Sequence, residues 1–211
     1  MKRWFLYLFF IFLCITWKVN GQTLKSCDLI FHVEGESDFS SAITSSTSRE
    51  DSISFVHVGI IMSDEKGHVK VIEASPSEGV RSVSLEDFLK EAPLIDEKPG
   101  AVVKRLTIPF SVSSVIEIAV SFMGQPYDWW YMPDNGKMYC SELIYESFVD
   151  EKGEKIFKPQ PMNFRSRDGS LPNFWVKLFS ELGEEVPEGV LGSNPNDLSR
   201  DKRLIEVIRY F

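Results

Sequence analysis

The chain lacks the short motifs that mark many metal-dependent and nucleotide-dependent enzymes. It has no His-Glu-x-x-His pair of metal ligands, no phosphate-binding loop and no Gly-x-Ser-x-Gly nucleophile motif. Cysteine and histidine are scarce as well, with three residues of each type among 211. We therefore expect no metal and no organic cofactor, so a catalytic site has to use the few nucleophilic and titratable side chains present.

Long hydrophobic runs are nearly absent. The uncharged apolar stretch over residues 4–17 is shorter than the roughly 20 residues that a membrane-spanning helix needs. Lys2 and Arg3 precede it, and the sequence Val-Asn-Gly follows it at residues 19–21. A basic start, an apolar centre and small residues at the end are typical of a secretory signal. An uncleaved N-terminal anchor is the alternative.

The signal predicts an exported protein. We expect cleavage after Gly21, which leaves residues 22–211 as a single periplasmic or extracellular domain without an integral membrane span. Cleavage would remove three basic residues and no acidic one, so the balance changes from 23 basic against 31 acidic to 20 against 31, or −11. An acidic chain without clustered Lys and Arg argues against nucleic acid as a partner.

The rest of the sequence alternates between strand-like and helix-like segments without internal repeats. Strand-like runs, rich in β-branched and aromatic residues, cover residues 28–33, 53–62, 69–74, 102–108 and 204–210. Helical spacing and capping signals mark residues 84–89, 113–123, 139–149 and 173–182, with a last turn from Pro195 and a short helix or loop within 39–52. Partly segregated strands and helices indicate an α+β fold, and nothing divides the chain into two cores.

Two of these strands form a predicted hairpin that brings a histidine to a glutamate. With a three-residue loop over residues 64–66, paired residues have numbers that sum to 130, and His57 lies directly opposite Glu73. Cross-strand partners have Cβ atoms about 4.5–5.5 Å apart. Apolar neighbours on both faces predict burial, and a buried carboxylate fixes the imidazole tautomer and favours the protonated ring. A satisfied structural pair without reactivity is the alternative.

The third chemical group is Cys140, which stands where an apolar-periodic helix begins, after the turn-forming residues 133–136. The helix dipole and the free amides at a helix N-terminus stabilise a thiolate. With a nearby histidine such a cysteine is a nucleophile for acyl transfer, and its own N–H helps to bind the oxyanion. Because free cysteines are often inert core residues, and because spacing alone does not bring Cys140 to His57, both interpretations stay open.

Four segments carry a family resemblance. They are residues 28–31 (Asp-Leu-Ile-Phe), 56–60 (Val-His-Val-Gly-Ile), 71–74 (Val-Ile-Glu-Ala) and 139–143 (Tyr-Cys-Ser-Glu-Leu), supported by 124–128 (Gly-Gln-Pro-Tyr-Asp) and 195–198 (Pro-Asn-Asp-Leu). Together they resemble the YiiX/YaeF-type permuted papain-like amidases of the NlpC-like cysteine hydrolase superfamily, over about residues 27–211. The histidine and glutamate precede the cysteine, as the circular permutation requires. Cys27 departs from the pattern, which usually has glycine there.

The resemblance implies a circularly permuted papain-like fold, with an antiparallel sheet or small barrel packed against helices. It also implies Cys140 as nucleophile, His57 as general base and acid, and Glu73 as the residue that orients His57. The implied reaction is hydrolysis of an amide through a thioester on the cysteine, without a cofactor. Tyr127 and Asp128 are candidates for binding the substrate, with Tyr127 as a second oxyanion donor, although an Asp after a Tyr also caps turns.

The substrate class stays open at this point. Export and superfamily membership indicate a peptide partner, such as one derived from peptidoglycan, whereas the permuted group also resembles enzymes that act on lipid amides or esters, including acyltransferases. A noncatalytic binding module is the alternative from another class. In that case Cys27 and Cys140 would form one structural disulfide, as an exported protein with two cysteines can. Catalysis instead requires a free thiol at Cys140.

Overall fold

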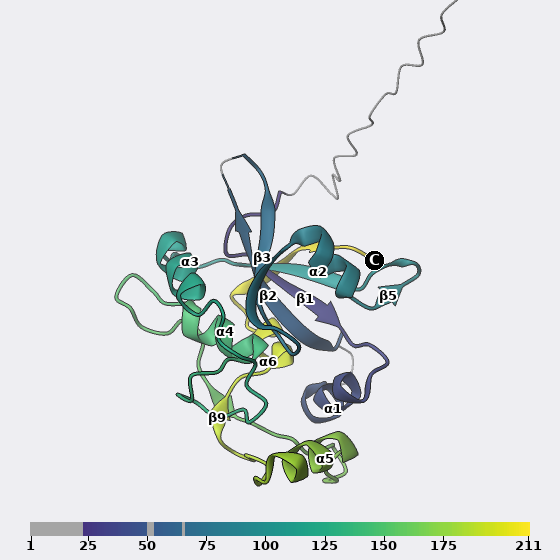
Figure 1. Ribbon diagram of the computed structural model, residues 1–211. Coiled ribbons are helices and arrows are strands. Elements are labelled where there is room, and N and C mark those ends of the chain that lie inside the picture. Colours follow the sequence, from purple (N-terminus) through teal and green to yellow (C-terminus); the bar gives the residue numbers. More distant parts are fainter. Residues whose placement is uncertain (1–22, 50–52, 65) are drawn as a thin grey trace, which may run out of the picture.

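The fold is built on one antiparallel sheet. A computed structural model of the protein describes residues 23–49, 53–64 and 66–211, and the predicted signal with its cleavage site lies outside these described residues. Six strands pair in the order β10-β7-β1-β2-β3-β4 (Figure 1). They are β1 (Leu29–Val33), β2 (Phe55–Ser63), β3 (Val69–Ser75), β4 (Gly79–Ser84), β7 (Ala101–Leu106) and β10 (Leu204–Arg209). Together with the helices, this sheet confirms the predicted α+β class.

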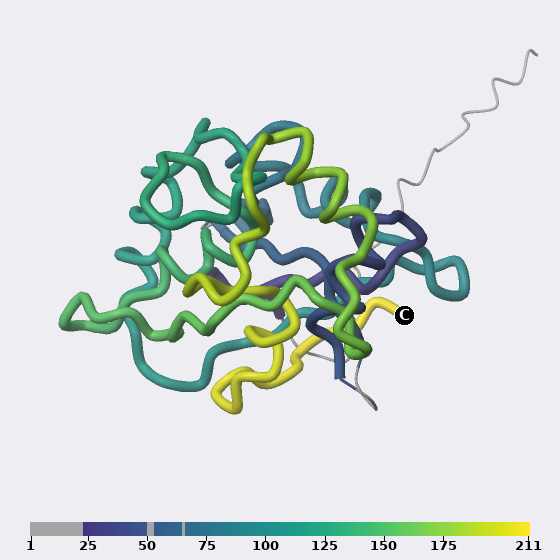
Figure 2. Tube along the Cα trace, turned by 90° about the horizontal axis from the view of Figure 1, so that it is seen from below, coloured from purple at the N-terminus to yellow at the C-terminus, as the bar shows by residue number. Residues whose placement is uncertain are grey.

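Helices pack around the sheet and extend away from it. In the described part of the chain they are α1 (Asp38–Thr47), α2 (Leu85–Glu91), α3 (Val112–Ser121), α4 (Cys140–Ser147), α5 (Asn173–Leu182) and α6 (Pro195–Ser199). Two short ribbons join β5 (Leu94–Ile95) to β6 (Lys98–Pro99) and β8 (Gln160–Pro161) to β9 (Leu191–Gly192). Helices α4 and α6 pack against β2, and α1 lies beside α5 (Figure 2). No helix among the described residues is long and apolar enough to cross a bilayer.

The sheet separates two apolar clusters. Leu29 and Phe31 of β1 belong to the larger one, which also includes side chains of α3, α4 and α5. Ile30, between them in the chain, belongs to the smaller one, which includes Phe88 of α2. All three β1 side chains are fully buried. Because the smaller cluster covers the second face of the sheet, polar side chains that point to that face near α2 are also shielded from water.

The predicted hairpin forms, but its predicted register is wrong. Gly59 pairs with Glu73, so paired residues have numbers that sum to 132 rather than 130. The strands end at Ser63 and resume at Val69, since the Asp64 carboxylate accepts hydrogen bonds from the backbone N–H groups of Lys66 and His68 and organises a longer loop. A shift of two residues keeps every side chain on its predicted face. His57 and Glu73 therefore become diagonal neighbours on one face instead of direct partners.

Candidate active site

His57 and Glu73 contact each other across β2 and β3. The His57 Nε2 atom lies 2.5 Å from the Glu73 Oε2 atom, and the side chains are 14% and 1% exposed. Diagonal neighbours in a sheet have Cα atoms about 7–8 Å apart, which side chains of this length can bridge. Gly59 stands directly opposite Glu73 and presents no side chain between the two groups. The pairing predicted from the sequence is thus present, in a different register.

An aromatic ring from α2 holds the imidazole. The Phe88 ring stacks on His57 with centroids 5.7 Å apart and an angle of 29° between the planes. Phe88 itself is fully buried. The imidazole is therefore confined between a carboxylate and an apolar ring, an arrangement that limits its rotation.

Cys140 is the first residue of α4 and is 5% exposed. Its thiol lies close enough to the His57 side chain to raise the pKa of that imidazole. The preceding residue, Tyr139, has its backbone N–H bound by the Glu142 carboxylate at 3.3 Å, which fixes the start of the helix. At the first helical position the backbone N–H has no partner within the helix. The site thus offers a thiol, an imidazole and a free amide N–H at one point.

The electrostatics of the pair favour a charged imidazole. Burial by itself lowers the pKa of His57, but hydrogen bonds and charge interactions with Cys140 and Glu73 outweigh it and raise the pKa to about 10. Burial by itself raises the pKa of Glu73. The hydrogen bond and charge of His57 and the charge of Arg81 outweigh burial, so the pKa of Glu73 lies below its usual value. The carboxylate is therefore ionised and the imidazole protonated at neutral pH.

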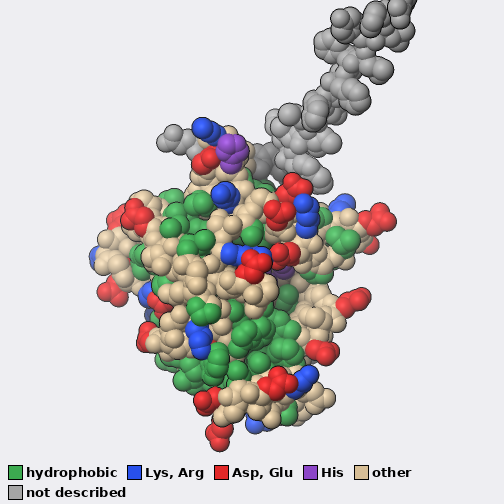
Figure 3. Space-filling model, viewed as in Figure 1, with side chains coloured by type: hydrophobic (Ala, Val, Ile, Leu, Met, Phe, Trp, Pro, Cys, Tyr) green, Lys and Arg blue, Asp and Glu red, His purple; other side chains and the backbone are tan. Residues whose placement is uncertain are grey.

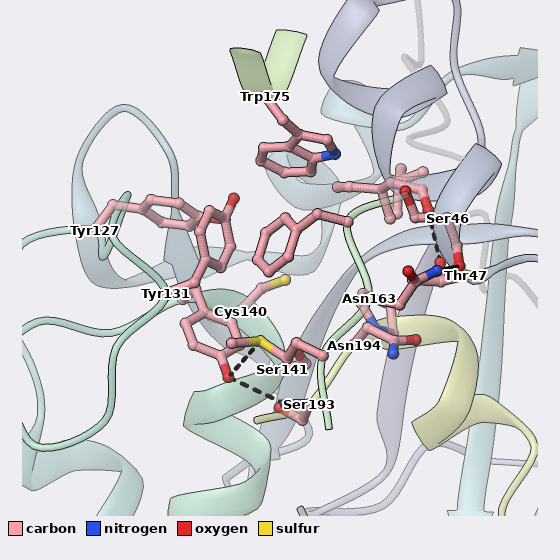
Figure 4. Close-up of a pocket in the computed structure, with 16 residues that line it drawn as sticks. Ser46, Thr47, Tyr127, Tyr131, Cys140, Ser141, Asn163, Trp175, Ser193 and Asn194 are labelled. Carbon is pink, nitrogen blue, oxygen red and sulfur yellow. Dashed lines mark hydrogen bonds between the residues drawn. The ribbon is translucent and has the colours of Figure 1, made fainter. Parts of the chain in front are cut away.

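A cavity with a volume of about 50 Å³ opens beside the cysteine. Figure 4 shows Cys140 with its sulfur pointing into this space, between the tyrosine side and a polar side that includes Asn163 and Asn194. Aromatic and apolar side chains form most of the wall: Ile43, Val56, Tyr127, Tyr131, Tyr139, Met162, Phe164, Trp175 and Pro195. None of the residues that line the cavity carries a formal charge. The space-filling view shows hydrophobic side chains gathered over the α4 and α6 region of this face (Figure 3).

The two candidate substrate-binding residues separate in the structure. Tyr127 lines the cavity beside Cys140, as the prediction requires. Asp128 is not among the residues that line this cavity. Its fully buried carboxylate accepts hydrogen bonds from the backbone N–H groups of Trp130 and Met132 and from the Asn135 side chain. All its bonding capacity goes into shaping this turn, the alternative role that its place after Tyr127 suggests.

The disulfide alternative is wrong for this structure, because Cys27 and Cys140 are both free thiols. The Cys27 Sγ atom lies 3.7 Å from the Val112 carbonyl oxygen, at the start of α3. Burial and the neighbouring Asp28 charge raise the pKa of Cys27 to about 12. Cys140 instead contacts His57 and faces the cavity. Cys27 is therefore a core residue, whereas Cys140 is placed where a thiol could react with a bound molecule.

A comparison with known protein families shows to which family the chain belongs. Residues 23–208 match the family described as "Permuted papain-like amidase enzyme, YaeF/YiiX, C92 family". The chain belongs to this family of permuted papain-like amidases. Its membership confirms the resemblance noted in the sequence and supports a cysteine hydrolase in general terms.

Relatives of this chain include YiiX proteins of Escherichia coli. The uncharacterized protein YiiX of Escherichia coli K12 is 24% identical over 163 residues, which cover 76% of this chain and 74% of YiiX. A crystal structure of metalloprotein yiiX from Escherichia coli O157:H7 superposes with a TM-score of 0.69 at 22% identity. The superposition covers 88% of this chain and 97% of the other, so the permuted fold is shared.

The yiiX of that crystal structure is described as a metalloprotein. In this chain, within residues 23–49, 53–64 and 66–211, no three His, Cys, Asp or Glu side chains are grouped so that they could hold a metal ion. His57 already uses Nε2 for the Glu73 carboxylate. The described side chains thus do not fit a resident metal ion.

Sequence reasoning missed two parts of the site. Arg81, in β4, lies directly opposite Glu73 and donates hydrogen bonds to it. A lone arginine in the next segment of the chain is a weak signal, because β4 is not predicted as a strand. The cavity wall was the second omission: Trp175 comes from α5 and Ile43 from α1, and only the folded chain brings them beside Cys140.

Proposed function

We propose that this protein is a cysteine amidase in which Cys140 is the nucleophile, His57 the general base and acid, and Glu73 the group that orients His57. The observation that carries the proposal is the placement of His57 between the Cys140 thiol, which raises the pKa of the imidazole, and the Glu73 carboxylate, whose Oε2 atom lies 2.5 Å from His57 Nε2. Nucleophile, base and orienting group in contact are the signature of covalent acyl transfer.

The reaction proceeds in two halves. The Cys140 sulfur attacks the amide carbon, the S–C bond forms, and the oxyanion is held by the free N–H at the start of α4 with Tyr127 as a second donor. His57 gives its proton to the leaving amine as the C–N bond breaks, which leaves a thioester and a neutral imidazole. A water molecule then loses a proton to His57 and attacks the thioester. The acid leaves and the thiolate–imidazolium pair is restored.

The cavity wall favours an apolar acyl part in the substrate. A peptide derived from the cell wall carries carboxylates and amines, and such groups need charged or hydrogen-bonding partners when they are buried. The wall beside Cys140 contains no charged side chain, whereas Tyr131, Phe164 and Trp175 present aromatic surfaces. We therefore place an acyl amide or ester ahead of a muropeptide as substrate. The predicted signal places this reaction outside the cytoplasm.

The test compares the wild type with Cys140→Ser on 4-nitrophenyl acetate and 4-nitrophenyl butyrate. We expect a burst of nitrophenol from the wild type, an added acyl mass on Cys140 in rapidly quenched samples, and neither in the variant. Product analysis with a primary amine present separates a hydrolase, which yields free acid, from an acyltransferase, which yields the new amide. Absence of both the burst and the adduct in folded wild-type protein would contradict the proposed function.

A further inference from the structure

Glu73 has two carboxylate oxygens with separate partners. Oε2 contacts His57, while Oε1 accepts a hydrogen bond from the Arg81 Nε atom at 2.9 Å and lies 2.8 Å from Arg81 Nη2. Glu73 is 1% exposed, so water does not supply alternative partners. The rotation that would bring a different oxygen to His57 requires the bonds to Arg81 to break. The orientation of the carboxylate is therefore determined by the arginine as well as by the histidine.

Arg81 is itself fixed in place. It stands directly opposite Glu73 in the β3–β4 register. Its Nη2 atom donates to both carboxylate oxygens of Glu91, at 2.7 and 2.8 Å, and its Nη1 atom lies 3.2 Å from Glu78. Glu91 is the last residue of α2, the helix whose Phe88 stacks on His57. One guanidinium thus connects the carboxylate partner of the histidine to the helix that packs on the histidine ring.

We propose that Arg81 is a positioning residue of the active site, which holds the Glu73 carboxylate ionised and aimed at His57. This inference rests on the proposed function of Cys140, His57 and Glu73. The planar guanidinium places its Nε and Nη2 atoms on the same Glu73 oxygen, Oε1, and a buried carboxylate without a compensating cation is strongly disfavoured. The ion pairs of Arg81 are with Glu73, Glu78 and Glu91, so its action on the site passes through Glu73.

The experiment substitutes Arg81→Met and follows hydrolysis of 4-nitrophenyl butyrate against pH. We expect kcat to fall by roughly 10- to 100-fold, because a carboxylate displaced by a fraction of an ångström orients His57 poorly, while KM stays within about twofold. Without the guanidinium, Glu73 takes up a proton more readily. The acid limb of the pH profile should therefore move to higher pH by about one unit.

A matched control and a conservative variant complete the test. Glu86 of α2 is 79% exposed and pairs with Lys90 rather than with Arg81, so Glu86→Gln should leave kcat and the acid limb unchanged. Arg81→Lys keeps the positive charge but cannot bridge Glu73 and Glu91 with one planar group. We expect it to keep the acid limb in place and to lower kcat several-fold, which gives a result even where Arg81→Met does not fold.

The outcomes separate this inference from the function on which it rests. A wild type with no turnover and no adduct on Cys140 contradicts the proposed amidase. An active wild type whose kcat and acid limb are unchanged in folded Arg81→Met overturns the role of Arg81 alone. A wild-type kcat in Arg81→Lys would contradict the need for a group that bridges Glu73 and Glu91. A stability loss without a kinetic change would assign Arg81 to structure only.

Discussion

At the scale of single residues, the His57–Glu73 contact depends on a side chain that is missing. A Cβ atom on Gly59 would lie 2.4 Å from the Val71 Cγ1 atom and 3.3 Å from the Phe88 ring. The first of these distances is too short for any two carbon atoms that are not bonded. Phe88 stacks on His57, and Gly59 stands opposite Glu73. A side chain at residue 59 that displaces its neighbours would therefore disturb the contact between His57 and Glu73.

Gly59→Ala should therefore weaken both stability and activity. Overpacking in a well-packed interior costs about 1–3 kcal/mol in the free energy of unfolding. We expect a loss of that size in chemical denaturation and a lower kcat on 4-nitrophenyl butyrate. Gly35→Ala is the matched control, since its Cβ would meet only Pro93 atoms at 3.6 Å or more. Equal stability of the two variants would contradict this account of Gly59.

Glu73 itself supplies charge as well as orientation. Glu73→Gln keeps a hydrogen-bonding side chain of the same shape but removes the negative charge that helps to raise the pKa of His57 to about 10. We expect that pKa to fall, so that the thiolate–imidazolium pair forms less readily. Alkylation of Cys140 by iodoacetamide at about pH 6 should slow by roughly tenfold, the factor that corresponds to a fall of about one unit in the pKa of His57. In Glu86→Gln, which changes an exposed residue of α2 paired with Lys90 and keeps the Glu73 charge, alkylation should proceed as in the wild type.

At the scale of elements, helix α4 begins with a buried acid. Glu142 is 8% exposed and accepts a hydrogen bond from the Tyr139 backbone N–H. Burial raises the pKa of Glu142 to about 8, and the bond from Tyr139 opposes that shift only in part. The helix that carries Cys140 is therefore capped by a carboxyl group that is largely protonated at neutral pH.

This acid makes stability depend on pH with a definite sign. The folded pKa of about 8 lies above the unfolded value of about 4.3, so the folded state binds more protons between these values and the free energy of unfolding falls as pH rises through them. Glu142→Gln should remove this dependence and raise stability above about pH 8 by on the order of a few kcal/mol. Urea denaturation between about pH 5 and pH 9 measures it. Glu181→Gln, on the exposed face of α5, should leave the dependence unchanged.

Most of the longer helices and strands are predictable from this sequence, with β4 as the exception, whereas strand pairing is less so. The helix over 173–182 is found with the predicted bounds, because Pro172 precedes it and Gly183 ends it in the left-handed conformation at φ 70°. The hairpin register was wrong by two residues, since it depends on how Asp64 binds the loop amides. The prediction that His57 and Glu73 lie on the same face of the sheet is still correct, because a register shift of two residues keeps each side chain on its face.

At the scale of the whole molecule, the catalytic site combines segments that the sequence keeps far apart. The cavity wall includes Ile43, Cys140, Trp175 and Pro195, which lie on α1, α4, α5 and α6. Residue types and local spacing indicate each group separately, and the resemblance to a known family adds the pairing of cysteine with histidine. The uncharged wall, on which the proposed choice of substrate rests, combines these four helices with residues outside them such as Tyr127, Tyr131 and Met162, so no local pattern predicts it.

Folding also places Cys27 and Cys140 in different surroundings, one inside the core and one at the cavity. Cys27 is 2% exposed and its pKa is raised to about 12 by burial and by Asp28, while Cys140 contacts His57 at the cavity. Native protein that starts at residue 22 should therefore take up one carbamidomethyl group from iodoacetamide, at Cys140, and a second only after unfolding in guanidinium. Mass spectrometry of the intact chain and its peptides counts and locates the groups.

Two cysteine variants identify which thiol takes up the carbamidomethyl group. Cys140→Ser should take up no group while folded, and Cys27→Ala should still take up one at the wild-type rate. Labelling of both cysteines at equal rates would show that burial does not protect Cys27. No labelling until a reductant is added would show that the two thiols form a disulfide in solution, which would remove the nucleophile. Because the reagent needs no substrate, this test of the activated thiol is independent of which amide or ester the enzyme hydrolyses.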